Sequence, residues 1–232
     1  IESAALSAVR FNKTAVTSLL AQEKLWLDEG QNAYDLLTNT FTAATIADSL
    51  SGFGISTGED RRTALPQNPQ NGSVMRMSLS RLNAIYPEGD ARRASMFTIS
   101  ASANVATLII RDTRVVELLP KREINLLFAE AAWKSGRLEE AKNYLTTAAT
   151  GATEDYAALT EETFAAALLL ERQRMLAGTG QRFFDLIRFD KVSAYIPEFT
   201  DADVDKGAAW WPLSANSMNS NSWSQNSFWS HP

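Results

Sequence analysis

The segment from Glu123 to Ala149 constrains the fold more than any other part of the chain. It reads EINLLFAEAAWKSGRLEEAKNYLTTAA, with Ala129 and Ala132 ahead of Gly136 and Ala141 after it. Small residues at facing positions let two helices approach closely, and a glycine at the break permits a tight turn. Apolar residues also recur every three or four positions on both sides of the break. The segment is therefore predicted to form a hairpin of two closely packed helices.

A second helical hairpin is predicted nearer the start of the chain. From Lys13 to Leu27, apolar residues recur at helical spacing among good helix formers, and Gly30 follows just past the end. Another helical phase runs from Ala33 to Leu37, with an extension toward Phe41. Because the break between the two helices is short, they are expected to run antiparallel.

Both hairpins resemble tetratricopeptide units, the one at Glu123 to Ala149 more closely than the first. So few repeats cannot form a solenoid alone, because stacked repeats must bury each other's apolar faces. Further helices are needed, and the segment from Glu161 to Leu176 supplies one. Thr160 is its expected N-cap, acidic residues occupy its first turn, and Phe164 and Leu168 lie on a broad apolar face.

The remaining segments predict the domain organisation. A short β-prone run, Ala106 to Ile110, could form a strand or equally finish a buried helix. The chain is therefore predicted to be mainly α, with tetratricopeptide-like helical hairpins wrapped by long loops. Glycines and prolines interrupt any regular period in a long loop near residues 51–73. We predict a single helical domain over residues 1–213 and a polar C-terminal segment over 214–228. Residues 229–232, WSHP, are interpreted as the remnant of an affinity tag.

Composition excludes several classes of function. The chain has 22 Lys and Arg against 27 Asp and Glu, a net charge of −5, and its basic residues are scattered, so nucleic acid is not an expected partner. Cysteine is absent and the one histidine is His231, which excludes thiolate-zinc sites and histidine-based triads. The alternating carboxylates of Asp201 to Asp205 lack the glycine and distal glutamate of an EF-hand loop. We therefore expect no metal and no cofactor.

The stretch from Glu171 to Lys191, ERQRMLAGTGQRFFDLIRFDK, carries a specific resemblance. It resembles the C-terminal signature of the SusD/RagB family, ER-x-R-x-L-A-x-x-G-x-R-x-F-D-L-x-R. Met175, Gly178 and Thr179 depart from the acidic and aromatic residues usual within that signature. The matching residues on which we rely are Glu171, Arg172, Arg174, Gly180, Arg182, Phe184, Asp185 and Arg188.

Other segments resemble the same family in the same order. Leu82 to Phe97 ends in the family's D-x-R-R turn, with Asp90, Arg92 and Arg93 in place. The helical hairpin follows, and Trp210 to Phe228 resembles the family's terminal stretch, although Ser214 and Ser227 replace prolines. Family members are usually longer, and their N-terminal lipid-bearing cysteine is missing from this sequence.

The resemblance implies a SusD-like α/α superhelical fold and a role in nutrient capture. Such a protein is a surface-exposed lipoprotein of the outer membrane that binds an oligosaccharide or a peptide. It passes this ligand to a SusC-like TonB-dependent transporter, and its membrane association comes from a lipid anchor not present in this sequence. No catalysis is implied. The alternative is a tetratricopeptide-type adaptor that binds a protein segment and has no small-molecule ligand.

The charged residues of the signature are interpreted as structural. Asp185 lies three residues from both Arg182 and Arg188, and Glu171 lies three residues from Arg174, which suits pairing on a helix surface. Carboxylate pairs such as Glu139 and Glu140 are expected to be solvated, so a glycosidase, although considered, is not predicted. We assign Asp90, Arg92 and Arg93 a structural role on the same grounds.

Aromatic side chains are the remaining candidates for ligand contact, because sugar rings stack on flat side chains. Trp26 and Trp133 fall within the predicted hairpins and are assigned to the scaffold. Trp211 is expected to pack and Trp229 to belong to the tag. The candidates for ligand contact are Trp210, Tyr86 and Phe53, the last two of which are expected in loops.

Overall fold

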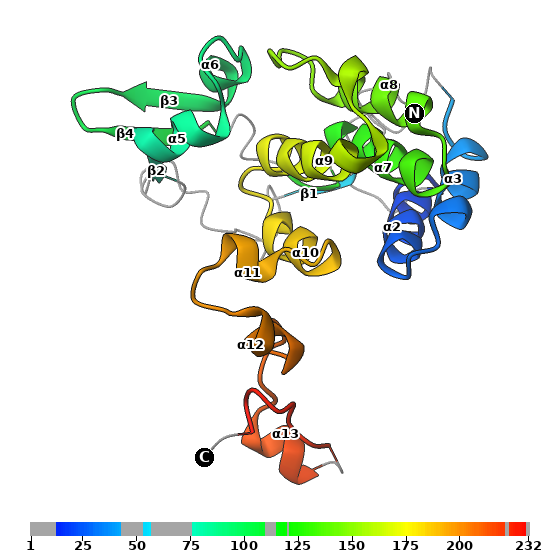
Figure 1. Ribbon diagram of the computed structural model, residues 1–232, viewed down its shortest axis with the longest axis vertical. Helices are drawn as coiled ribbons and strands as arrows, with labels where there is room; N and C mark the ends of the chain where they lie inside the picture. Colours follow the sequence, from blue (N-terminus) through cyan, green and yellow to red (C-terminus); the bar gives the residue numbers. More distant parts are fainter. Residues whose placement is uncertain are drawn as a thin grey trace. The chain divides into compact units, whose positions relative to one another are not determined.

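The computed structural model describes residues 13–42, 53–56, 76–109, 115–119, 121–220 and 223–230. The chain divides into two compact units, Ile1–Thr179 and Gly180–Pro232, which we describe separately. It is mostly helical with a few short strands, as the sequence predicts (Figure 1). The predicted boundaries at residues 213 and 228 and the tag remain predictions, and most of the predicted loop near 51–73 lies outside the described residues.

The first helical hairpin consists of α2 (Lys13–Trp26) and α3 (Gly30–Thr38), which confirms the prediction. Ala15, Ala21 and Leu25 of α2 are buried. The helical spacing predicts that the other apolar residues share this buried face, but they are exposed. The exposed apolar residues of α2 and the turn after it are Val16, Leu19, Leu20, Trp26 and Leu27.

Gly30 is the first residue of α3 rather than a residue between helices. A Cβ atom at this position would lie 2.4 Å from the Lys134 Cβ atom and 2.9 Å from the Lys134 carbonyl carbon. Only glycine permits this approach, because real Cβ atoms do not come so close to a backbone. Gly30 thus sets the distance between α3 and the helix that contains Lys134.

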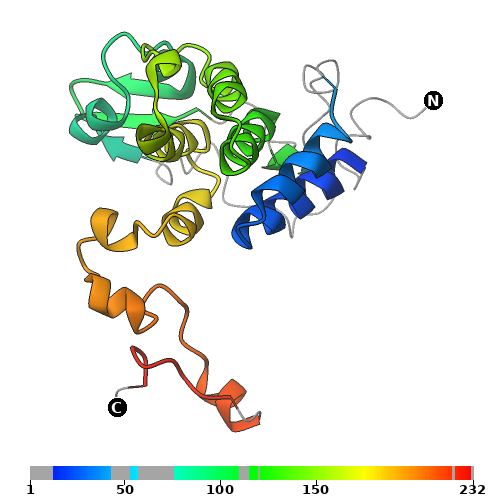
Figure 2. The ribbon, with the colours of Figure 1, turned by 45° about the vertical axis from the view of Figure 1, so that its right-hand side comes forward.

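The second hairpin consists of α7 (Lys121–Lys134) and α8 (Leu138–Ala148), as predicted. Gly136 has a φ of +77° in the turn, a conformation that favours glycine. Ala129, Ala132 and Ala141 are fully buried where the helices meet. Phe41 and Ile124 belong to one core cluster shared by both hairpins, and Figure 2 shows the hairpins in blue and green.

A third layer of the first unit is formed by α9 (Glu161–Met175), preceded by the 3-10 turn Tyr156–Ala158. Thr160 begins α9, and its backbone N–H donates to the Thr163 hydroxyl oxygen over 2.9 Å. Phe164 and Leu168 are fully buried, and the centroids of the Phe164 and Trp133 rings are 5.8 Å apart. The predicted helix is confirmed, and it covers α7 and α8.

Residues 76–109, here called the sheet module, form the other part of the first unit. The strands β2 (Arg76–Ser78), β3 (Phe97–Ser100) and β4 (Val105–Leu108) make an antiparallel sheet in the order β2-β4-β3. Between β2 and β3 lie α5 (Leu79–Ile85) and α6 (Arg92–Met96). The sequence predicts only the strand near β4.

A second pair of strands joins distant parts of the chain. β1 (Phe53–Ser56) pairs antiparallel with β5 (Val115–Leu119). Phe53 therefore lies in a strand, and its predicted place in a loop is wrong. Strands this short carry too few residues for a reliable alternating pattern.

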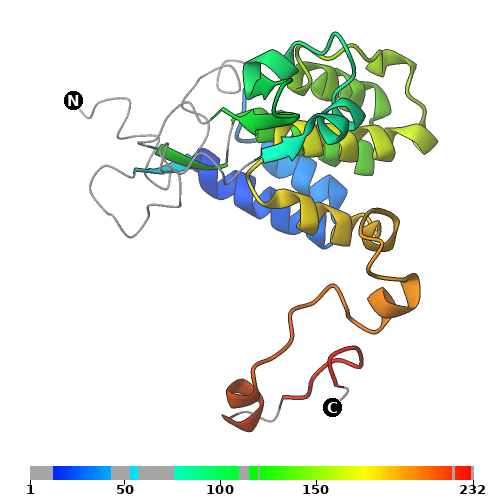
Figure 3. The same ribbon diagram turned by 90° about the vertical axis from the view of Figure 1, so that its left-hand side faces the viewer.

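The described part of the second unit contains four short helices, drawn in gold to red in Figure 3. They are α10 (Gln181–Arg188), α11 (Val192–Tyr195), α12 (Asp201–Asp205) and α13 (Ala215–Ser220). Thr200 caps α12 by accepting a hydrogen bond from the Asp203 N–H. Among the helices of the described residues, none combines the length and apolarity that a bilayer crossing requires.

Candidate functional site

The signature residues of α9 form a buried charge cluster with residues of the sheet module. The Arg92 guanidinium donates to both oxygens of Asp90, over 2.9 and 2.6 Å, and to Glu171. Arg174 donates to Glu171 and to Glu154, each over 2.6 Å. We call these five residues, Asp90, Arg92, Glu154, Glu171 and Arg174, the charge cluster.

Burial of the charge cluster differs from the prediction. Glu171 and Arg174 pair at the predicted spacing, as do Asp185 and Arg188 over 3.0 Å, but these pairs are buried rather than on a helix surface. The reason is that Glu171 faces Arg92 of the sheet module, 79 residues away in sequence. Neither motif alone indicates the other as its partner, so the cluster is not predictable from the local sequence.

The electrostatics of the charge cluster favour the structural interpretation. Burial raises the pKa of Asp90, but the hydrogen bonds and charge of Arg92 outweigh it, so this pKa lies below its ordinary value. Burial likewise raises the pKa of Tyr156, and the negative charge of Glu171 adds to the effect. Charges of opposite sign alternate from Asp90 to Glu154, so each guanidinium is already occupied by carboxylates. This arrangement does not form a site for an external anion.

Arg172 and Arg93, the remaining arginines of the two motifs in this unit, make separate contacts. The buried Arg172 guanidinium lies 3.5 Å from the Glu123 carboxylate of α7. Arg93 donates to the Asn83 side chain over 2.6 Å and to the Tyr86 carbonyl over 3.4 Å, so its contacts stay within the sheet module.

The rest of the signature lies in the second unit. Gly180 precedes α10 with a φ of +84°. The Arg182 guanidinium lies over the Tyr195 ring, 4.6 Å from its centroid, and the Phe184 side chain is about half exposed. Asp185 is buried beside Arg188. These contacts assign the signature a structural role in both units.

Tyr86 does not have the position expected of a ligand contact. It lies just after α5, outside the helix as predicted, but only 1% of its surface is exposed. Its hydroxyl donates to the Arg174 carbonyl over 2.7 Å, and its ring lies 5.3 Å from the Phe97 ring between centroids. Tyr86 is therefore a packing residue. No contacts of the Phe53 side chain are described, and its role stays a prediction.

Trp210, the remaining candidate, is exposed as predicted, and other tryptophans of the second unit are exposed with it. Trp211 is 84% exposed, so its predicted packing is wrong. We call three of them the aromatic surface: Trp210, Trp211 and Trp223, with 54%, 84% and 58% of their surface exposed.

Hydrogen bonds hold the segments that carry the aromatic surface. The Trp229 indole N–H donates to the Trp210 carbonyl over 2.7 Å. The Gln225 side chain bonds to both the N–H and the carbonyl of Leu213, each over 3.2 Å. The Asn226 amide donates to the Gly207 carbonyl over 3.0 Å. Residues 207–213 and 225–229 are thus fastened to each other, which fixes the backbone that carries these rings.

The chemistry around the aromatic surface is neutral. Residues 207–230 contain no Asp, Glu, Lys, Arg or His, and they are rich in serine and asparagine. Flat apolar rings beside amides and hydroxyls suit a ligand with apolar ring faces and neutral hydroxyl groups. The absence of charge between Gly207 and Ser230 was visible in the sequence and is the signal that could have identified this surface.

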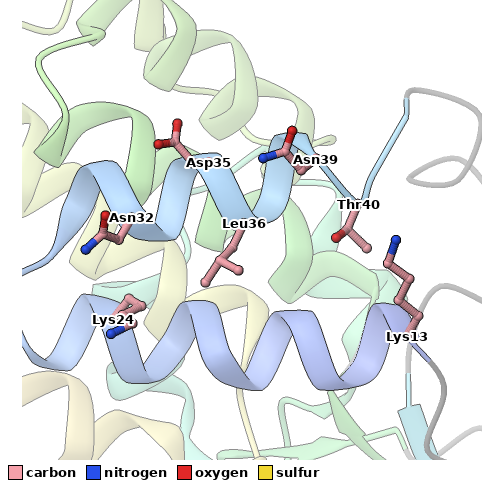
Figure 4. Close-up of a pocket in the computed structure, with 7 residues that line it drawn as sticks. All are labelled: Lys13, Lys24, Asn32, Asp35, Leu36, Asn39 and Thr40. Carbon is pink, nitrogen blue, oxygen red and sulfur yellow. The ribbon is translucent and has the colours of Figure 1, made fainter.

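An open groove of about 430 Å³ lies along the first hairpin. Its lining residues are Lys13, Lys24, Asn32, Asp35, Leu36, Asn39 and Thr40, of which Leu36 points toward α2 (Figure 4). Its polar groups are engaged within the hairpin, since Lys24 and Asn32 both contact Glu29, over 3.0 and 2.7 Å. None of the predicted ligand contacts lines the groove. Within the described residues, no group of acidic or histidine side chains is arranged to hold a metal ion.

Comparisons with known proteins agree with this geometry. Residues 123–231 match the family model described as SusD family, a range that includes α7 to α9, the signature and the aromatic surface. None of the curated proteins compared with the chain gives a match.

Two crystal structures of SusD superfamily proteins from Bacteroides thetaiotaomicron VPI-5482 share the fold. The first has a TM-score of 0.72 and 22% identity over 94% of this chain and 58% of its own. The second has a TM-score of 0.57 and 22% identity over 78% of this chain and 50% of its own. The chain thus spans little more than half the length of these relatives. Residues 123–231 are thus similar to the SusD family, and the chain shares its fold with SusD superfamily proteins.

Proposed function

We propose that the protein is a nutrient-binding protein of the cell surface that binds a neutral oligosaccharide through the aromatic surface. The match of residues 123–231 to the SusD family suggests nutrient binding. The observation that carries the ligand assignment is the group of three exposed tryptophans, Trp210, Trp211 and Trp223, in a segment without charge. Binding without chemical conversion of the ligand is part of the proposal.

The choice of an oligosaccharide over a peptide rests on chemistry. A sugar ring presents apolar C–H faces that stack on an indole, and its hydroxyls match the amides and hydroxyls of residues 214–220. A peptide carries charged termini and often charged side chains, for which residues 207–230 offer no partner. Trp211, with the most exposed ring, is the expected centre of the contact.

Calorimetric titration with panels of neutral oligosaccharides and of peptides tests this proposal. Replacing Trp211 by alanine removes one stacking surface and is expected to weaken oligosaccharide binding about three- to tenfold. Trp26→Ala is the matched control, because it removes another partly exposed indole from α2, in the first unit. Equal binding by the wild type and Trp211→Ala, or binding of peptides alone, would refute the assignment.

The proposed destination of the ligand is a SusC-like TonB-dependent transporter in the outer membrane, with the protein held at that membrane by a lipid anchor. The similarity to the SusD family supports this partnership in general terms. Co-purification of the native protein from outer membranes tests it directly. Recovery of a TonB-dependent barrel in stoichiometric amount is expected, and consistent failure to recover one would count against the transport role.

One observation favours the second candidate, a protein-binding adaptor. Val16, Leu19 and Leu20 form an exposed apolar stripe on α2, which continues to Leu27. Such a stripe suits contact with another helix. Leu19→Glu would abolish recovery of a protein partner if the adaptor function holds, and it would leave oligosaccharide binding unchanged.

A further inference from the structure

The sheet module has its own small hydrophobic core. Leu82, Tyr86, Phe97 and Ala106 are buried together, and they form a cluster separate from the one shared by the two helical hairpins. Among the described residues, Ala177, just after α9, is the one hydrophobic residue from outside the module that packs against this cluster. Little apolar packing therefore fastens the described part of the module to the helices.

Directional polar contacts make the attachment instead. Arg92 of the module bonds to Glu171 of α9. Tyr86 donates to the Arg174 carbonyl over 2.7 Å, while the Arg174 guanidinium donates to the Ile85 carbonyl over 2.6 Å. The Ala91 N–H donates to the carbonyl of Gly151, after α8, over 3.0 Å. These contacts meet at one place, the charge cluster.

These polar contacts between the sheet module and the helices, here called the joint, behave differently from an apolar interface. Apolar contacts are non-directional and tolerate sliding, whereas buried ion pairs need fixed geometry and are strongly destabilised when one partner is removed. Without Arg92, the buried Asp90 carboxylate would lose its guanidinium partner, and Glu171 would keep only its contact with Arg174. The contacts of the joint are therefore expected to form together and to be lost together.

We infer that the sheet module opens from the helices as one unit and that the charge cluster is the latch that holds it closed. Arg92 is the central positioning residue, because it bonds to a carboxylate on each side of the joint. The core of the module stays intact in the open state, since it depends on contacts within residues 76–109. The inference is independent of the proposed ligand.

Hydrogen exchange of the full-length chain, read by mass spectrometry, tests the latch. Arg92→Met keeps the apolar stem of the side chain but removes the guanidinium. It is expected to speed exchange about tenfold or more at the joint, at residues 85–92, while α7 and α8 exchange at the wild-type rate. Arg93→Met is the matched control, because the neighbouring arginine bonds only within the module in the contacts described above. Its exchange at the joint should match the wild type.

Three outcomes would overturn the inference: no change at the joint in Arg92→Met, an equal increase over the whole first unit, or an equal effect of Arg93→Met. If Arg92→Met does not fold, the same exchange measurement is made on Glu154→Gln. This variant is milder, because Glu154 lies at the partly exposed end of the charge cluster. A two- to threefold increase in the exchange rate, confined to the joint, supports the latch. This is the order of magnitude expected when one ion pair is weakened. An unchanged or uniformly raised exchange rejects it.

Discussion

Two kinds of residue decide how this chain is built, and they differ in the property through which they act. Gly30 acts through the absence of a side chain, which lets α3 approach Lys134 of α7. Arg92 acts through its charge, which joins Asp90 to Glu171. In both cases a partner, Lys134 or Glu171, lies far away in sequence. The residue type can be read from the sequence, but the contact cannot.

Gly30→Ala tests the close approach of α3 and α7. The added methyl group would meet the Lys134 backbone, so we expect the free energy of unfolding to fall by about 1–3 kcal/mol. Urea denaturation followed by circular dichroism gives this value. In Gly136→Ala nothing lies within 4 Å of the new Cβ atom and only the positive φ opposes the change, so a loss of about 1 kcal/mol is expected. A smaller loss in Gly30→Ala than in Gly136→Ala would contradict this account.

Helices were predictable at the scale of elements because their patterns are local. The two hairpins and α9 follow helical spacing over 9 to 15 residues. The strands have three to five residues, and β1 pairs with β5 across about 60 positions, so, apart from the β-prone run near β4, no local pattern marks them. Periodicity did not identify the buried side of α2, since the small residues Ala15 and Ala21 face the core while Leu19 and Leu20 face outward.

Leucine-to-alanine substitutions measure this difference between helices. Leu168 of α9 is fully buried, so Leu168→Ala is expected to cost about 2–5 kcal/mol of the free energy of unfolding. Leu19 of α2 is 44% exposed, so Leu19→Ala is expected to cost less than about 1 kcal/mol. Urea denaturation of both variants makes the comparison. Similar losses would show that α2 buries its leucines in solution.

The division into two units governs the whole molecule, and it was not predicted. The boundary between Thr179 and Gly180 falls inside the family signature, where sequence similarity gives no sign of a break. The signature predicted the family and the fold, but the tryptophans that make the aromatic surface follow it in a segment without strong periodicity. Trp211 was assigned to packing because it adjoins a family motif, and its exposure depends on how residues 207–213 fold back on 225–229.

Separate unfolding of the two units is the expected consequence. Trp26 and Trp133 are the tryptophans of the first unit, so with both replaced by phenylalanine the fluorescence reports on the second unit alone. Circular dichroism reports mainly on the longer helices of the first unit. We expect the fluorescence midpoint in urea to be lower than the dichroism midpoint, because the second unit has short helices and little buried core. Coincident midpoints in the same variant would show that the chain unfolds as one cooperative body.

The neutrality of residues 207–230 has a consequence for the environment in which the protein works. With no ionisable side chain in that stretch, neither added salt nor a drop in pH has anything there to screen or protonate. A ligand held by these indoles would stay bound with nearly the same strength in brackish and in acidic media.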